Sequence, residues 1–130
     1  MLFFGHRFIK SSCFYHIFDI DMIAKTPSSS QLYLEFSEKN LDIINHLRLN
    51  NISFALHVRS TTELLYASAL GADYIVVEKK EAKTAQNIAE NYLFDAKIVV
   101  HITDEEEIEE MALLGIDGVI FPEAIVKISS

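Results

Sequence analysis

The stretch FALHVRSTTELLYASALGADYIVV at residues 54–77 recurs as IVVHITDEEEIEEMALLGIDGVIF at residues 98–121, with a constant offset of 44 residues. Upstream, LYLE at residues 32–35 matches IVVE at residues 75–78, with an offset of 43. A chance similarity is hard to sustain over this length. The sequence therefore predicts a tandem duplication whose unit contains two strands and two helices.

Five short runs rich in β-branched residues predict buried parallel strands, because they are apolar on both faces. They lie at about residues 31–36, 52–58, 73–78, 97–102 and 118–121. Helices are expected between them, at about residues 38–49, from the capping residue Ser60 to Gly71, at about residues 81–94, and from the capping residue Asp104 to Gly115. Alternating strands and helices predict right-handed βαβ crossovers in one parallel sheet.

These patterns predict a single small α/β domain over residues 1–130, with tandem βαβα repeats at 31–73 and 74–121. A closed (β/α)₈ barrel needs on the order of 250 residues. We therefore expect either a partial, half TIM-barrel-like sheet or an open, flavodoxin-like sheet. Exposed sheet edges would be covered by the chain's own N-terminal arm or by a second copy, and we favour a homodimer. Residues 1–30 form either such an arm or an extra βα unit.

Composition and charge exclude several functional classes. The chain has 11 Lys plus Arg against 19 Asp plus Glu, a net charge of -8, which disfavours nucleic acid and anionic membrane surfaces as partners. No apolar run approaches the roughly 20 residues of a membrane helix. The single Cys13 cannot form an intramolecular disulfide, and its apolar surroundings predict a small buried residue. A cytoplasmic protein fits these features.

Polar residues close the predicted strands. In chain order they are Glu35, His57, Glu78 and His101, so carboxylates and imidazoles alternate as the duplication requires. Ligands of parallel α/β sheets bind beyond the C-terminal ends of the strands, so a site is expected there. Two interpretations remain open: a row of polar groups that hydrogen-bond to one another, or a metal or catalytic site.

The closing segment VVHITDEEEIEEMALLGIDGVIFPEAI at residues 99–125 resembles the last β-α-β segment of the glycerophosphodiester phosphodiesterase family. Three upstream segments are similar to its motifs: Gly5-His6-Arg7 to the early His-Arg-Gly, Phe18-Asp19-Ile20-Asp21 to the Glu-x-Asp metal motif, and Leu34-Glu35-Phe36-Ser37 to the strand with a third metal-binding acid. The resemblance implies catalytic roles for His6 and Arg7, and a divalent metal held by Asp19, Asp21 and Glu35. Read from the residues alone, Asp19 is instead the N-cap and Asp21 a first-turn acid of a short helix.

Two functions from different classes remain. The first, which we favour, is a non-catalytic module that works by self-association or through a protein partner. The second is a metal-dependent phosphodiesterase of the glycerophosphodiester type, reduced from a barrel ancestor. The sequence leaves open whether the protein is an enzyme.

Overall fold

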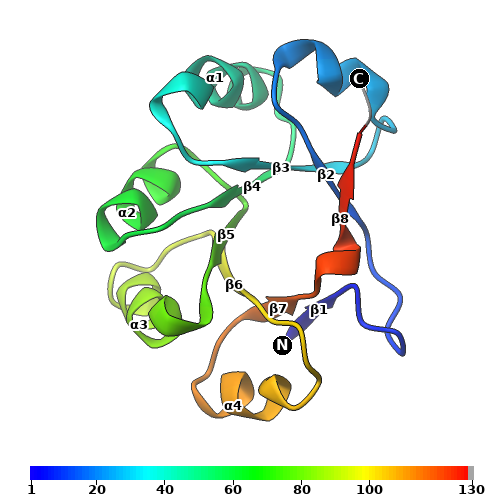
Figure 1. The fold of residues 1–130 in the computed structure, drawn as a ribbon. Coiled ribbons are helices and arrows are strands. Elements are labelled where there is room, and N and C mark those ends of the chain that lie inside the picture. The colour runs from blue at the N-terminus through cyan, green and yellow to red at the C-terminus, as the bar shows by residue number, and fades with distance from the viewer. Residues whose placement is uncertain (129–130) are drawn as a thin grey trace.

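The protein's computed structural model, which describes residues 1–128, contains one sheet of eight parallel strands in the order β1-β7-β6-β5-β4-β3-β2-β8. The strands are β1 (Leu2–Phe4), β2 (Phe14–His16), β3 (Gln31–Glu35), β4 (Phe54–His57), β5 (Tyr74–Val77), β6 (Lys97–His101), β7 (Gly118–Ile120) and β8 (Ile125–Lys127). The sheet curls into a partial barrel, with the helices on its outer side (Figure 1). The TIM-barrel-like alternative is therefore correct, and the open flavodoxin-like sheet is not.

Four α-helices connect the strands of the repeat, as the sequence predicts. They are α1 (Leu41–Leu49), α2 (Thr61–Ala69), α3 (Ala82–Asn91) and α4 (Glu107–Leu113). Single 3₁₀ turns, η2 (Glu38–Asn40) and η3 (Lys79–Glu81), precede α1 and α3. Among residues 1–128, no helix combines the length and the apolar composition that a membrane span requires.

The start of α2 follows its expected capping box, whereas the start of α4 does not. The Ser60 hydroxyl accepts a hydrogen bond from the Glu63 N–H at 3.1 Å, and the Glu63 carboxylate accepts one from the Arg59 N–H at 3.0 Å. In α4, Glu107 makes the same reach-back bond, to the Thr103 N–H at 3.3 Å. The Asp104 side chain does not cap, because a turn precedes the helix and delays its start to Glu107.

Each face of the sheet carries its own apolar core. The outer face packs against the helices. The inner face forms a second cluster from alternate residues of successive strands: Phe4, Phe14, Tyr33, Ala55, Val76, Val99, Ile120 and, after β7, Ala124. Phe4, Phe14 and Tyr74 lie with ring centroids 5.0 to 5.5 Å apart in edge-on contacts. Because these rings come from β1, β2 and β5, their contact requires the sheet to curl around them.

The N-terminal segment supplies two strands to the sheet. β1 pairs with β7, and β2 pairs with β3 and β8, while the 3₁₀ helix η1 (Ile20–Lys25) follows β2. The edges of β3 and β7 are thus covered by the chain's own residues, so they supply no reason for a second copy. The sequence predicts five of the eight strands. β7, with three residues, is among them because it lies in the repeat, whereas β1, β2 and β8 are equally short and lie outside it.

Two glycines allow β1 to approach its neighbours. A Cβ atom on Gly118 would lie 2.9 Å from the Leu2 Cβ, and one on Gly5 would lie 2.9 Å from the Ala124 backbone nitrogen. Gly5 also has a φ of +83°, in the left-handed region that L side chains rarely adopt. Both positions therefore require glycine where the first strand meets the end of the chain.

Cys13 is exposed, so the expectation of a buried thiol is wrong. The reason is its position directly before Phe14, whose ring is fully buried inside the curled sheet. Successive residues of an extended segment point to opposite sides. The inward position of Phe14 therefore turns Cys13 outward.

Candidate functional site at the C-terminal rim

Four polar side chains of the duplicated strands lie on the inner face at the C-terminal rim of the sheet. Glu35 and His57 end β3 and β4, Glu78 directly follows β5, and His101 ends β6. Each stands two residues after a member of the inner apolar cluster, namely Tyr33, Ala55, Val76 and Val99. Because side chains of a strand alternate with a period of two, the rim residues continue the same inner face.

His57 bridges the two carboxylates. Its Nδ1 lies 2.6 Å from Glu35 Oε2, its Nε2 lies 2.9 Å from Glu78 Oε2, and its side chain is 11% exposed. Burial alone would lower the pKa of His57, but the hydrogen bonds and charges of Glu35 and Glu78 outweigh burial and raise the pKa above its ordinary value. The His57 imidazole is therefore stabilised in its protonated form, donating to both carboxylates.

His101 faces the same space from β6. Its Nε2 shares a hydrogen bond of 3.0 Å with the Tyr33 hydroxyl, and its ring centroid lies 5.3 Å from that of His57. Burial lowers the pKa of His101, and burial with the charges of Glu35 and Glu78 raises the pKa of Tyr33. Both groups are therefore neutral near pH 7.

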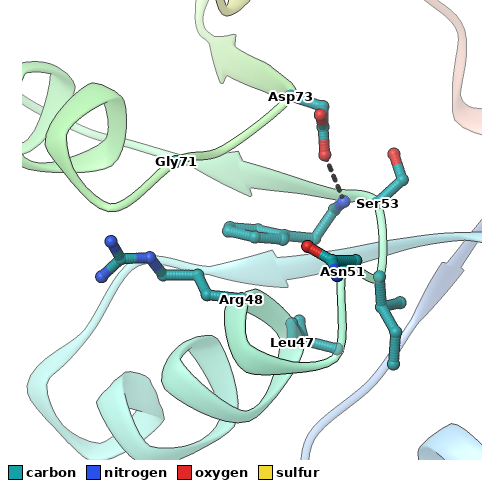
Figure 2. Close-up of a pocket in the computed structure, with 8 residues that line it drawn as sticks. Leu47, Arg48, Asn51, Ser53, Gly71 and Asp73 are labelled. Atoms are coloured by element: carbon teal, nitrogen blue, oxygen red, sulfur yellow. Dashed lines mark hydrogen bonds between the residues drawn. The ribbon is translucent and has the colours of Figure 1, made fainter.

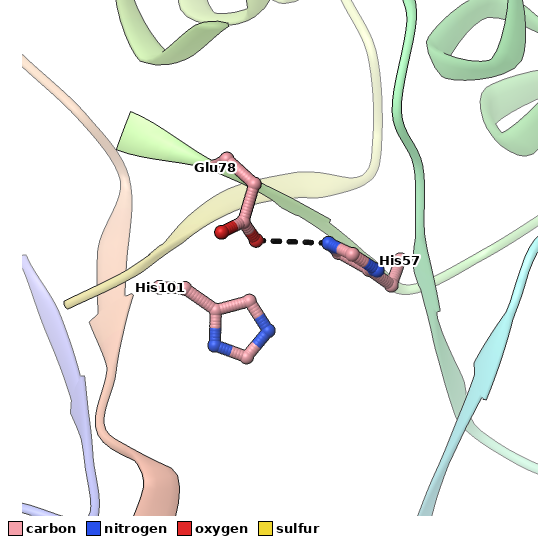
Figure 3. Close-up of side chains that lie close together, drawn as sticks. All are labelled: His57, Glu78 and His101. Carbon is pink, nitrogen blue, oxygen red and sulfur yellow. Dashed lines mark hydrogen bonds and ion pairs between the residues drawn. The ribbon is translucent and has the colours of Figure 1, made fainter. Parts of the chain in front are cut away.

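His57, Glu78 and His101 each offer a ligand atom within 4.8 Å of the others (Figure 3). Among residues 1–128, this is the only group of three or more His, Cys, Asp or Glu side chains with such spacing. Figure 3 shows the three side chains converging from neighbouring strands. Two imidazoles and one carboxylate are ligands that first-row transition metals accept.

His16 is a rim residue that the sequence reasoning missed. It ends β2, its ring stacks on Phe18 at 4.4 Å, and it meets Tyr33 edge-on at 5.0 Å. Burial lowers the pKa of His16. The available signal was its place two residues after the buried Phe14, but a strand of three residues gives too short a pattern to assign an inner face.

His6 and Arg7 follow β1, and the family resemblance implies catalytic roles for them. Both contact Glu105, in the turn that precedes α4. His6 Nε2 lies 3.2 Å from Glu105 Oε1, and Arg7 Nε donates to the same oxygen at 2.7 Å. The shared Glu105 carboxylate connects the loop after β1 to the loop before α4. These contacts supply a structural explanation for both side chains.

The structure does not assemble Asp19, Asp21 and Glu35 into one ligand set. Asp19 is the N-cap of η1 and accepts a hydrogen bond from the Met22 N–H at 2.9 Å, while Asp21 lies exposed in the first turn. Glu35 instead contacts His57 and lies 3.3 Å from the Arg59 guanidinium. The helix-capping interpretation of Asp19 is therefore correct.

Two clefts flank the three candidate ligands at this rim. The first, of about 360 Å³, is lined by His57, Arg59, Glu78, Lys80 and Glu81. The second, of about 320 Å³, is lined by Glu78, His101, Ile102, Thr103, Glu107 and Pro122. Because Glu78 borders both clefts, a metal at the cluster would be reachable from either side.

A further cleft of about 330 Å³ lies at the opposite end of the sheet, where α1 ends and β4 begins (Figure 2). There the Asp73 carboxylate accepts a hydrogen bond from the Phe54 N–H at 3.0 Å, and in the second repeat Asp117 accepts one from the Ile98 N–H at 2.9 Å. Asp117 also lines a similar cleft of about 350 Å³ where α3 ends. The duplicated architecture explains both clefts, so neither is our candidate site.

Neither the family models nor the curated proteins that were searched match this chain. The resemblance to glycerophosphodiester phosphodiesterases therefore stays a prediction from short segments. The functional argument rests on the geometry of the rim.

Proposed function

We propose that this protein binds a divalent transition-metal ion, with Zn²⁺ as the best-suited candidate, through His57, Glu78 and His101. The observation that carries the proposal is the convergence of these three side chains within 4.8 Å. His57 ends β4, Glu78 directly follows β5 and His101 ends β6, and the pairing of these three neighbouring strands sets the register of their backbones. A site on such strands is better held than one on mobile loops.

To hold a metal, the three ligand atoms must draw closer than the 4.8 Å within which they now lie. Tetrahedral Zn²⁺ with bonds of 2.0 to 2.2 Å keeps neighbouring ligand atoms about 3.4 Å apart. His57 Nε2 and Glu78 Oε2 are 2.9 Å apart because a proton joins them. Replacing that proton with a metal moves these two atoms slightly apart, and a nitrogen of His101, within 4.8 Å of both, must move closer by rotation of its ring.

Residues of β3 support the proposed ligands from behind. Glu35 holds His57 Nδ1 at 2.6 Å, which leaves Nε2 directed toward Glu78 and the metal. A carboxylate behind a ligating imidazole fixes the ring and increases its basicity. Tyr33, two residues earlier on the same face, contacts His101 Nε2 at 3.0 Å and restricts that ring.

Three protein ligands leave a coordination position open to water or to another small molecule. At Zn²⁺ sites of this kind, the metal lowers the pKa of the bound water to about 7. Such a site supports hydrolytic chemistry as well as plain metal binding. The proposed ligands differ from those implied by the phosphodiesterase resemblance, so the proposal does not depend on that family.

A second candidate is the non-catalytic, self-associating module. The observation that favours it is that Glu35, His57 and Glu78 already satisfy one another without a metal. Static light scattering tests the self-association if the protein concentration reaches about 100 times a micromolar dimer dissociation constant. A monomer throughout that range would remove this candidate.

Calorimetric titration of the metal-free protein with Zn²⁺ tests the metal site. We expect one Zn²⁺ per chain, and a loss of affinity of at least about 100-fold in His57→Gln and in His101→Gln, since each removes a ligand. His46→Gln is the matched control, because His46 lies on α1 outside the rim. Mg²⁺ should bind poorly, because it prefers oxygen ligands.

The result that would overturn the proposal is wild-type protein that binds no Zn²⁺, or a His101→Gln variant that binds it as tightly as wild type. Circular dichroism establishes that each variant is folded. X-ray absorption at the zinc edge gives a second readout in wild-type protein. Fewer than two imidazole ligands would also contradict the site.

A further inference from the structure

The two clefts beside the proposed ligands differ in charge. Glu107 and Glu78 supply the charged groups of the cleft next to His101, and both are carboxylates. The cleft next to His57 contains two cationic side chains, Arg59 and Lys80, together with Glu78 and Glu81. A ligand that enters from the His57 side therefore meets two cationic lining residues, whereas no Lys or Arg lines the other cleft.

Lys80 differs from its neighbour Lys79 in its contacts. Lys79 contacts two carboxylates of α4, Glu110 at 2.9 Å and Glu107 at 3.6 Å. Lys80, by contrast, makes no ion pair with any residue from 1 to 128 and borders the cleft instead. Its ammonium group thus remains accessible to a ligand.

Metal binding would increase the positive character of this cleft. Glu78 would then be neutralised as a ligand, and Glu35 would be balanced by Arg59, which lies 3.3 Å away. The charges left uncompensated are those of Lys80 and the metal, against Glu81, and the Arg59 guanidinium still has N–H groups to donate. This local excess of positive charge stands against a chain whose net charge is -8.

On the basis of the proposed metal function, we infer that the open coordination position takes a small oxyanion, a phosphate or carboxylate group, which enters through the cleft of Arg59 and Lys80. One oxygen of the anion would bind the metal, and the others would accept hydrogen bonds from the two cationic side chains. Guanidinium and ammonium groups both bind such oxygens well. Comparing the binding of inorganic phosphate with that of acetate distinguishes a phosphoryl ligand from a carboxylate.

The test uses the full chain loaded with Co²⁺, whose visible spectrum reports the ligands at the metal. A first titration measures the Co²⁺ affinity of wild type, Lys80→Gln and the control Lys79→Gln, which we expect to be equal. Inorganic phosphate and acetate are then added at constant ionic strength. We expect a spectral change in wild type, and an anion affinity about fivefold weaker in Lys80→Gln, the size of one lost exposed charge contact.

Lys79→Gln should bind the anions as wild type does. A stronger response to phosphate assigns a phosphoryl ligand, and a stronger response to acetate assigns a carboxylate, and either supports the inference. A spectrum that neither anion changes, or equal anion affinities in Lys80→Gln and wild type, overturns it and leaves the metal site intact. Absence of Co²⁺ binding in the first titration overturns the metal site and the inference together.

Discussion

Replacement of Glu35 by Gln tests whether the carboxylate behind His57 tunes a metal site. In the wild-type protein, His57 Nδ1 lies 2.6 Å from a Glu35 carboxylate oxygen. Glu35→Gln keeps the shape of the side chain and an oxygen that can accept this hydrogen bond, but it removes the negative charge. Outer partners of ligating histidines contribute about 10- to 100-fold to metal affinity. This range corresponds to about 1.4 to 2.7 kcal/mol of binding free energy.

The assay is calorimetric Zn²⁺ titration near pH 8, where competition from protons at His57 is smaller than at neutral pH. This choice matters because Glu35→Gln also removes a partner that raises the pKa of His57, which by itself would favour metal binding. The matched control is Glu38→Gln, an exposed carboxylate in η2. A Glu35→Gln variant with wild-type affinity would refute the claim that Glu35 supports a metal ligand.

Three other predictions concern stability and protons. Leu93 is 85% exposed with a φ of +54°, so Leu93→Asn should raise the free energy of unfolding by about 0.5 to 1 kcal/mol in urea denaturation, whereas Leu113→Asn within α4 should lower it. Gly118→Ala should lower the unfolding free energy by about 1 to 3 kcal/mol, because its Cβ would lie 2.9 Å from the Leu2 Cβ; an unchanged denaturation midpoint would contradict this packing. Because the folded pKa of His57 is raised, Zn²⁺ must displace its proton, so the apparent Zn²⁺ affinity should increase with pH up to that pKa. Calorimetry in two buffers of different ionisation enthalpy should show that protons are released on binding. A binding enthalpy that is the same in both buffers would contradict the assignment of His57 as a ligand.

The sequence by itself determined the repeated part of the fold. Five strands and four helices are predictable because the duplication displays each apolar run and each helix end twice. The match between Asp73 and Asp117 even foreshadows equal hydrogen bonds, at 3.0 and 2.9 Å. The row from Glu35 to His101 is also predictable, since strand ends of a parallel sheet share one edge.

Only the tertiary structure decided how the sheet curls and which rim residues meet. Contacts between distant segments, such as Phe4 with Phe14 or Tyr33 with His101, leave no local pattern in the chain. The three-residue strands outside the repeat, including the one that ends at His16, are too short to show periodicity and have no second copy to reveal them. The physical reason is that periodicity reports the face a residue occupies in its own element, whereas a site depends on curvature, register and long-range packing, which together bring His57, Glu78 and His101 within 4.8 Å.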